Sequence, residues 1–247
     1  MFAIARLTFR EILNKRSLLL GLLLTVLFMV LFTLGLYFVE KNMRDTVELV
    51  RLSLAGELLT AGLFVSGMMI SAVTIFSSVG SISSEIENGI MLATAAKPLS
   101  RTQIFLGKYA GLGLALVGYS LLVFIAANMI VWRIFHFHTD GFLSAMAVFA
   151  LQPLVLLAAS LCGSTFLSTL RNRIFMLMLF SVAFIGGMVE YAGVQMSAVS
   201  LTGGAGEAVA ASSLTMIGIM TSLLMPVDSL YRLANFIILY GSSVPSQ

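Results

Sequence analysis

The sequence predicts an all-α, polytopic helical membrane protein, and composition, uncharged runs and the placement of Lys and Arg lead to this prediction. Of 247 residues, 59% are apolar and only 10% are charged, whereas soluble domains average about 45–50% and about 25%. So few charges would leave the surface of a soluble globule of this size largely bare hydrocarbon. The composition therefore excludes an average cytosolic enzyme, a disordered regulator and a nucleic-acid binder with a broad basic face. Length and charge also exclude a built-in ATPase domain.

Uncharged runs locate the membrane spans, because a helix needs about 20 apolar residues to cross the hydrocarbon core. Five spans are predicted at about 17–39, 58–80, 109–132, 141–170 and 174–193, with a candidate sixth at 208–227. The fourth run is longer than a crossing requires, so its helix is expected to tilt or bend near Pro153. A run at 233–240 is too short. The stretch 203–240 fits either a sixth span or two half-helices that dip in from one face.

The N-terminal segment 1–16 is predicted to be an amphipathic helix at the cytoplasmic interface, followed by a single transmembrane domain over 17–247. In segment 1–16, Phe2, Phe9 and Leu13 share an apolar face, while Arg6 and Arg10 lie on the other. This helix serves either as a topology anchor or as a functional elbow. Placing the N-terminus in the cytoplasm puts nine cations inside and four outside: Arg6, Arg10, Lys15, Arg16, Lys97, Arg101, Lys108, Arg171 and Arg173 against Lys41, Arg44, Arg51 and Arg133. The short basic segment 171–173 is expected to be a cytoplasmic hairpin.

The predicted cytoplasmic loop 81–108 is the most specific part of the sequence. Isoleucines recur at helical spacing over its first half, which predicts a short amphipathic helix. Pro98 ends that helix, and Ser100 with Gln103 fits a capping box. A new helix should therefore begin at Arg101 and run through Lys108 into the third span without a break. The loop either receives force from a cytosolic partner or lies on lipid as an ordinary amphipathic connection.

The same loop resembles a family signature. Its motifs are Glu85-x-Glu87-x-Gly89, then Lys97-Pro98-x-Ser100-Arg101, then Gly107-Lys108. They are similar to those of ATP-binding-cassette exporter permeases of the second class, above all the small permeases of the nitrous-oxide-reductase maturation and bacteriocin-export type. The resemblance extends to the amphipathic N-terminus, the span spacing and the 226–232 segment. The sequence departs from the family pattern at Ile90, where threonine is usual. The family also has a full span after the segment that corresponds to 226–232: either that crossing is missing here, or the sequence shown is shorter than the gene product, or 208–227 serves as the crossing.

The resemblance implies a permease subunit that is not itself an enzyme and that moves a substrate by using ATP hydrolysis on a separate subunit. It implies that the ATPase docks on the loop through a set of six residues: Glu85, Glu87, Gly89, Pro98, Ser100 and Arg101. ATP and Mg are expected on the partner, because the chain lacks a phosphate-binding Gly-x-x-x-x-Gly-Lys-Ser/Thr motif. A second permease chain, identical or homologous, should complete a dimer. The expected location is a bacterial or archaeal plasma membrane.

Other candidate sites are weaker. Glu190 lies near a late apolar segment without an obvious local partner and is the candidate pore or substrate residue. His136 and His138, with the carboxylate of Asp140, have no further strong metal ligand near them in the sequence. The methionine clusters suit apolar packing as well as copper, so no metal site is predicted. Gly111-x-x-x-Ala115 permits close helix packing within the chain or between two chains. The alternative function is a non-transporting membrane module, an immunity or sensor protein that binds a protein partner.

Overall fold

Six helices make up most of the structure, a computed structural model that describes residues 6–9, 16–43, 48–79, 101–139, 141–199, 213, 216, 220 and 227–240. The helices are α2 (Arg16–Asn42), α3 (Glu48–Ser78), α6 (Arg101–Phe135), α7 (Phe142–Phe166), α8 (Thr169–Val199) and α10 (Val227–Tyr240). Residues 6–9 add a turn of helix before α2, and no strand occurs in the described ranges. The helices α2, α3, α6, α7 and α8 are long and apolar enough to cross a membrane. The predicted all-α, multi-pass membrane protein is confirmed.

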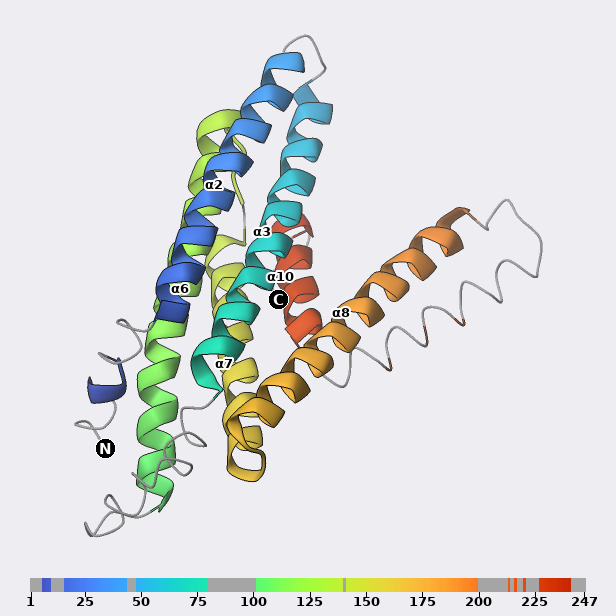
Figure 1. The fold of residues 1–247 in the computed structure, drawn as a ribbon. Helices are drawn as coiled ribbons and strands as arrows, with labels where there is room; N and C mark the ends of the chain where they lie inside the picture. The colour runs from blue at the N-terminus through green and yellow to red at the C-terminus, as the bar shows by residue number, and fades with distance from the viewer. Residues whose placement is uncertain are drawn as a thin grey trace, which may run out of the picture.

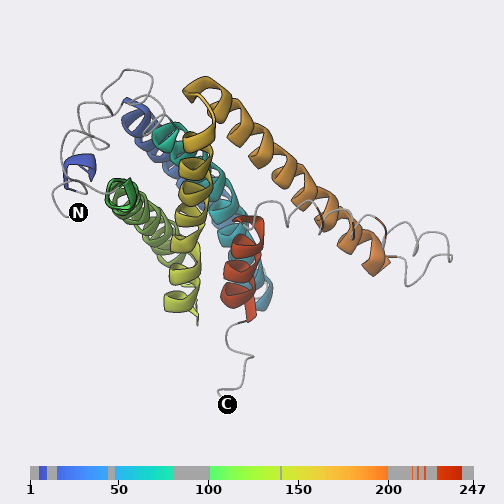
Figure 2. The same cartoon turned by 90° about the horizontal axis from the view of Figure 1, so that it is seen from below.

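The chain runs back and forth between two ends of the bundle, called here the Arg16 end and the Asn42 end (Figure 1). The α2, α6 and α8 helices start at the Arg16 end, and α3 and α7 start at the Asn42 end. The α8 helix leaves the bundle from the Arg16 end and diverges along its length, as both views show (Figures 1 and 2). The other four long helices pack side by side.

The helix bounds differ from the predicted spans in three places. The α3 helix begins at Glu48, ten residues before the predicted span, because charged residues can continue a helix beyond the hydrocarbon core. The α7 helix ends at Phe166 and α8 begins at Thr169. The predicted hairpin at 171–173 is therefore wrong: the turn lies at 167–168, and 171–173 belong to the start of α8. The α8 helix also continues to Val199, beyond the predicted end at 193.

The α3 and α6 helices form the centre of the bundle. Over its most apolar window α3 is 56% buried, against 11% for α2, so α2 presents most of its surface to the membrane. The main apolar core joins α3, α6 and α7 through buried side chains such as Leu63, Leu116, Phe124 and Phe149. Phe124 packs against Phe149 with ring centroids 5.4 Å apart. A smaller cluster around Leu156 and Met176 holds the start of α8 against α7.

The α10 helix is a half-helix packed into the membrane region. Its 14 residues rise about 21 Å, less than the hydrocarbon thickness of about 30 Å. The Tyr231 hydroxyl donates to the Thr60 carbonyl at 2.7 Å, partway along α3. Near its other end, Ile237 packs so closely on Gly141, at the start of α7, that a Cβ there would lie 2.3 Å from Ile237 Cγ2. A helix this short within the bundle must be shielded by protein, and the candidate sixth span at 208–227 stays a prediction, because only 213, 216, 220 and 227 of it are described.

Glycines allow α2 to approach α3. A Cβ at Gly62 of α3 would lie 2.4 Å from the Phe32 ring of α2. Phe32 in turn stacks on Phe28, with ring centroids 5.8 Å apart, which limits how far the ring can move. A second close approach lies nearer the start of α2, where a Cβ at Gly21 would lie 2.1 Å from Val73 Cγ2. Close packing at both glycines therefore helps to position α2 against α3.

We expect Gly62→Ala to lower the free energy of unfolding by about 1–2 kcal/mol, because the new methyl group overpacks the interface. Denaturant titration in mixed micelles measures the change. The matched control is Gly35→Ala on α2, where a Cβ would meet nothing within 4 Å. Equal stability of the two variants would show that α2 is not held by this contact.

Candidate functional site

The predicted docking residues fall mostly outside the described ranges. Residues 85–100, with Glu85, Glu87, Gly89, Pro98 and Ser100, lie in the undescribed segment 80–100. Arg101 is the first residue of α6, and the prediction of an unbroken helix from Arg101 into the third span is confirmed.

Glu190 lies on α8, one residue beyond the helix's membrane-spanning window Thr169–Val189. Its side chain is outside the description. Of the candidate sixth span, only 213, 216, 220 and 227 are described. The role of Glu190 as a pore residue stays a prediction.

The Arg16 ends of α3 and α6 flank the segment 80–100 on both sides and are well packed. Val79, the last described residue before the segment, is only 3% exposed. Lys108, two turns into α6, is also buried. The neighbouring Tyr109 hydroxyl donates to the Leu154 carbonyl of α7 at 3.4 Å. The α3 helix is therefore packed into the bundle up to its end, whereas α6 becomes buried from Gly107 onward.

Four buried polar residues, called here the polar clamp, join α3, α7 and α8 at this end: Ser78, Ser160, Ser164 and Asn172. The Ser78 hydroxyl donates to the Ser160 hydroxyl at 2.7 Å, across the α3–α7 interface. The Asn172 amide donates to the Ser160 carbonyl at 3.0 Å and to the Ser164 hydroxyl at 2.8 Å. Each of the four side chains is 1% exposed or less. Polar groups away from water are stable only when they are hydrogen-bonded, so these contacts fix the helices' relative positions.

Gly163 makes room for the polar clamp. A Cβ on Gly163 would lie 2.2 Å from Asn172 Oδ1, so only glycine allows the asparagine side chain to occupy this position. The Asn172 oxygen faces the Gly163 backbone and has no hydrogen-bond partner within the described ranges. The amide nitrogen must therefore point to the α7 carbonyl, which sets the orientation of the side chain.

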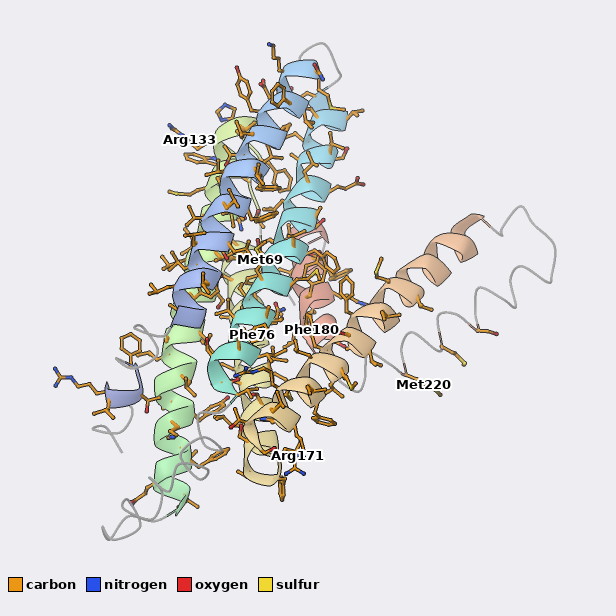
Figure 3. All side chains as sticks on the ribbon, viewed as in Figure 1. Met69, Phe76, Arg133, Arg171, Phe180 and Met220 are labelled. Atoms are coloured by element: carbon orange, nitrogen blue, oxygen red, sulfur yellow. The ribbon has the colours of Figure 1, made fainter. Side chains whose placement is uncertain are left out.

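Two arginines flank Asn172 at the start of α8. The Arg173 guanidinium lies over the Phe76 ring of α3, 5.9 Å from its centroid, within the range of a cation–π contact. The exposed Arg171 donates from Nε to the Ser168 hydroxyl at 2.8 Å and projects from this end of the molecule (Figure 3). The start of α8 therefore contacts α3 within three residues of the point where the segment 80–100 leaves it.

A second polar contact lies deeper in the bundle. Gln152 of α7 is 4% exposed, and its amide donates to the Gly67 carbonyl at 3.2 Å and to the Ser71 hydroxyl at 3.1 Å. The neighbouring Pro153 is buried inside α7 and cannot donate a backbone hydrogen bond. The α3–α7 interface thus has polar contacts at two levels, with apolar packing between them.

The sequence analysis missed the polar clamp and Gln152. Their signal was present as small and polar residues at helical spacing in apolar runs: Ser77-Ser78 in α3 and Ser160-x-x-Gly163-Ser164 in α7. Spacing alone does not say which helices such residues join. In the glycine-rich pattern of α6, Ala115 is in the main core and Gly113 faces Leu154 of α7, so these two residues pack within the chain. A Cβ at Gly118 would meet nothing within 4 Å, and a contact between two chains stays a prediction.

The described ranges hold no group of three or more His, Cys, Asp or Glu side chains suited to a metal ion. Asp140 is outside them. Among the methionines, Met176 is 1% exposed while Met178 is 63% exposed, so this pair does not face one site. The Met69 sulfur instead accepts a hydrogen bond from the Thr25 hydroxyl, at 3.9 Å, between α2 and α3.

No family model and no curated protein matches the sequence.

Proposed function

We propose that this multi-pass membrane protein is the permease subunit of an ATP-binding-cassette exporter and moves its substrate by using ATP hydrolysis on a separate subunit. The observation that carries the proposal is the motif set of the segment 85–108, from Glu85-x-Glu87-x-Gly89 to Gly107-Lys108. In this proposal the ATPase docks on that segment from the cytoplasm. A second permease chain completes the path, and ATP and Mg bind to the ATPase.

The helices that flank the segment support this proposal. A docked subunit that pulls on 80–100 acts on α3 and α6, which are the two most buried of the five long helices. The polar clamp passes a displacement of the α3 end to α7 and α8 through direct hydrogen bonds. Rigid helices joined in this way move together, as rocking between two states requires. In this proposal, the residues of this chain bind the ATPase and pass its movement on to the membrane helices.

Cysteine labelling tests the proposal. Cys162 is the only cysteine and is exposed, so it is first replaced by serine. In that background, Ser84→Cys should react with a membrane-impermeant maleimide only from the cytoplasmic side, and a docked ATPase should suppress the reaction. The control is Ser144→Cys, at an exposed position near the Asn42 end of α7, which should react only from the opposite side and regardless of the ATPase.

Labelling of Ser84→Cys from the exterior would contradict the proposed topology and the docking role together. Cytoplasmic labelling that no copurifying ATPase suppresses would favour the alternative of a membrane module that does not transport.

A further inference from the structure

An open hollow of about 320 Å³ lies at the Asn42 end of α6. Its lining includes the rings of Trp132, Phe137, Phe142 and His138 together with the polar side chains of Asn128 and Thr139. The Thr139 hydroxyl donates to the Asn128 side-chain oxygen at 3.1 Å. The hollow, called here the aromatic hollow, therefore combines aromatic rings with one pair of polar side chains.

The backbone beyond α6 is bent so that it forms one wall of this hollow. His136 has a φ of 55°, the left-handed region that residues other than glycine seldom adopt. Its N–H donates to the Trp132 carbonyl at 2.9 Å, and the chain then folds back along α6. His138 consequently meets Trp132 edge-on, with ring centroids 6.1 Å apart.

A second, separate hollow of about 390 Å³ lies nearer the middle of the membrane. It lies between α2 and α6 and is lined by apolar side chains such as Leu22, Met29 and Ala126. Thr25 and Tyr119 also line it, and their hydroxyl groups are hydrogen-bonded to each other. On α6 the two hollows adjoin, since Leu122 and Ala126 of this one are a helical turn from Ile125 and Met129 of the aromatic hollow. Together they follow α6 from 119 to 132 over about 20 Å, against about 15 Å for one leaflet.

We propose that these adjoining hollows bind one phospholipid of the leaflet at the Asn42 end, with its headgroup in the aromatic hollow and an acyl chain between α2 and α6. The order of chemistry along α6 matches that of a phospholipid: hydrocarbon toward the centre, then amide and hydroxyl groups, then aromatic rings at the depth where tryptophan favours the interface. The exposed Arg133 follows Trp132 and projects outward at this end, where it complements a phosphate (Figure 3). The inference goes beyond the proposed function, because it requires only that the bundle lie in a bilayer.

The single tryptophan of the chain, Trp132, reports occupancy directly. Phosphatidylglycerol with brominated acyl chains is titrated into the detergent-solubilised protein while tryptophan fluorescence is recorded. We expect saturable quenching that unbrominated phosphatidylglycerol reverses, while glycerol phosphate, a headgroup without chains, does not. Unbrominated phosphatidylcholine should displace the brominated lipid less well than unbrominated phosphatidylglycerol does. Arg133→Gln should remove this difference between the two lipids.

Ala126→Phe should weaken the apparent affinity about fivefold or more, because the ring fills the groove where the hollows adjoin. The control Leu114→Phe, on an exposed part of α6 outside both hollows, should leave the affinity unchanged. Quenching that rises linearly with lipid, or an equal effect of both variants, would overturn the proposal. Reversal of the quenching by glycerol phosphate alone would also overturn the proposal. So would a second copy of the chain that covers this face and keeps the brominated lipid from quenching Trp132.

Discussion

Glu87→Lys is expected to abolish the coupling between this chain and its ATPase. The proposed docking surface carries Glu85 and Glu87 on the cytoplasmic segment, where carboxylates meet cations of the partner. Reversing one charge replaces an attraction by a repulsion at close range, and such changes in an interface weaken association at least about tenfold. The stimulation of ATP hydrolysis by the permease should fall accordingly, together with the amount of ATPase that copurifies.

A matched charge reversal separates docking from a general effect of charge. Glu57→Lys makes the same change at an exposed position of α3, 21 residues before its Ser78 end. The described part of the chain places it away from the helix ends that flank 80–100. Glu57→Lys should therefore leave ATPase stimulation and copurification unchanged. Intact assembly and coupling in Glu87→Lys would refute the docking hypothesis, whatever the control shows.

The five spans could be predicted from the sequence because one physical requirement decides them. Hydrocarbon tolerates few charges over about 20 residues, so uncharged runs mark the crossings. Where helices end outside the hydrocarbon, that requirement no longer applies. The extension of α3 back to Glu48 and of α8 to Val199 was therefore not predictable from hydropathy. The start of α6 at Arg101 was predictable, because Pro98 and the capping box act locally.

The turn between α7 and α8 shows why charge alone misplaces a connection. The turn was predicted at the two arginines, but both belong to the start of α8, where Arg173 lies over Phe76, and the chain reverses at 167–168. Asn172 explains the difference. Its side chain must reach the Ser160 carbonyl, which requires α8 to begin before it. Pairings between helices of this kind depend on the fold and not on local pattern, so the polar clamp was not predictable.

The sequence left open whether 203–240 holds a sixth span or two half-helices, and of this stretch the structure describes only 213, 216, 220 and α10. The position of α10 depends on aromatic contacts that no local pattern predicts. The Phe64 ring of α3 stacks on Phe184 of α8 with centroids 5.6 Å apart and also meets Tyr231 of α10 at 5.2 Å. One residue of the central helix thus contacts both α8, which leaves the bundle, and α10, which packs against it. Beyond this contact α8 diverges, and α10 lies beside α3 and α7 (Figures 1 and 2).

Gly163→Ala is expected to lower the free energy of unfolding by about 2–4 kcal/mol, the largest stability effect predicted for a single methyl group in this chain. The methyl group and Asn172 Oδ1 cannot occupy the same space, so the asparagine must leave. Its two hydrogen bonds to α7 are then lost, and a buried amide is left unsatisfied. Loosening the polar clamp should also reduce ATPase stimulation without changing how much ATPase copurifies.

Denaturant titration in mixed micelles measures the stability effect, with Gly118→Ala as its control, because a Cβ there meets nothing within 4 Å. A double-mutant cycle with Asn172→Ala supplies the sharper test. Once the amide is gone, the methyl group has no oxygen to displace, so Gly163→Ala should cost about 1 kcal/mol or less in that background. Additive costs would mean that the glycine acts through backbone flexibility. The contact with Asn172 would then not be what holds α8 to α7.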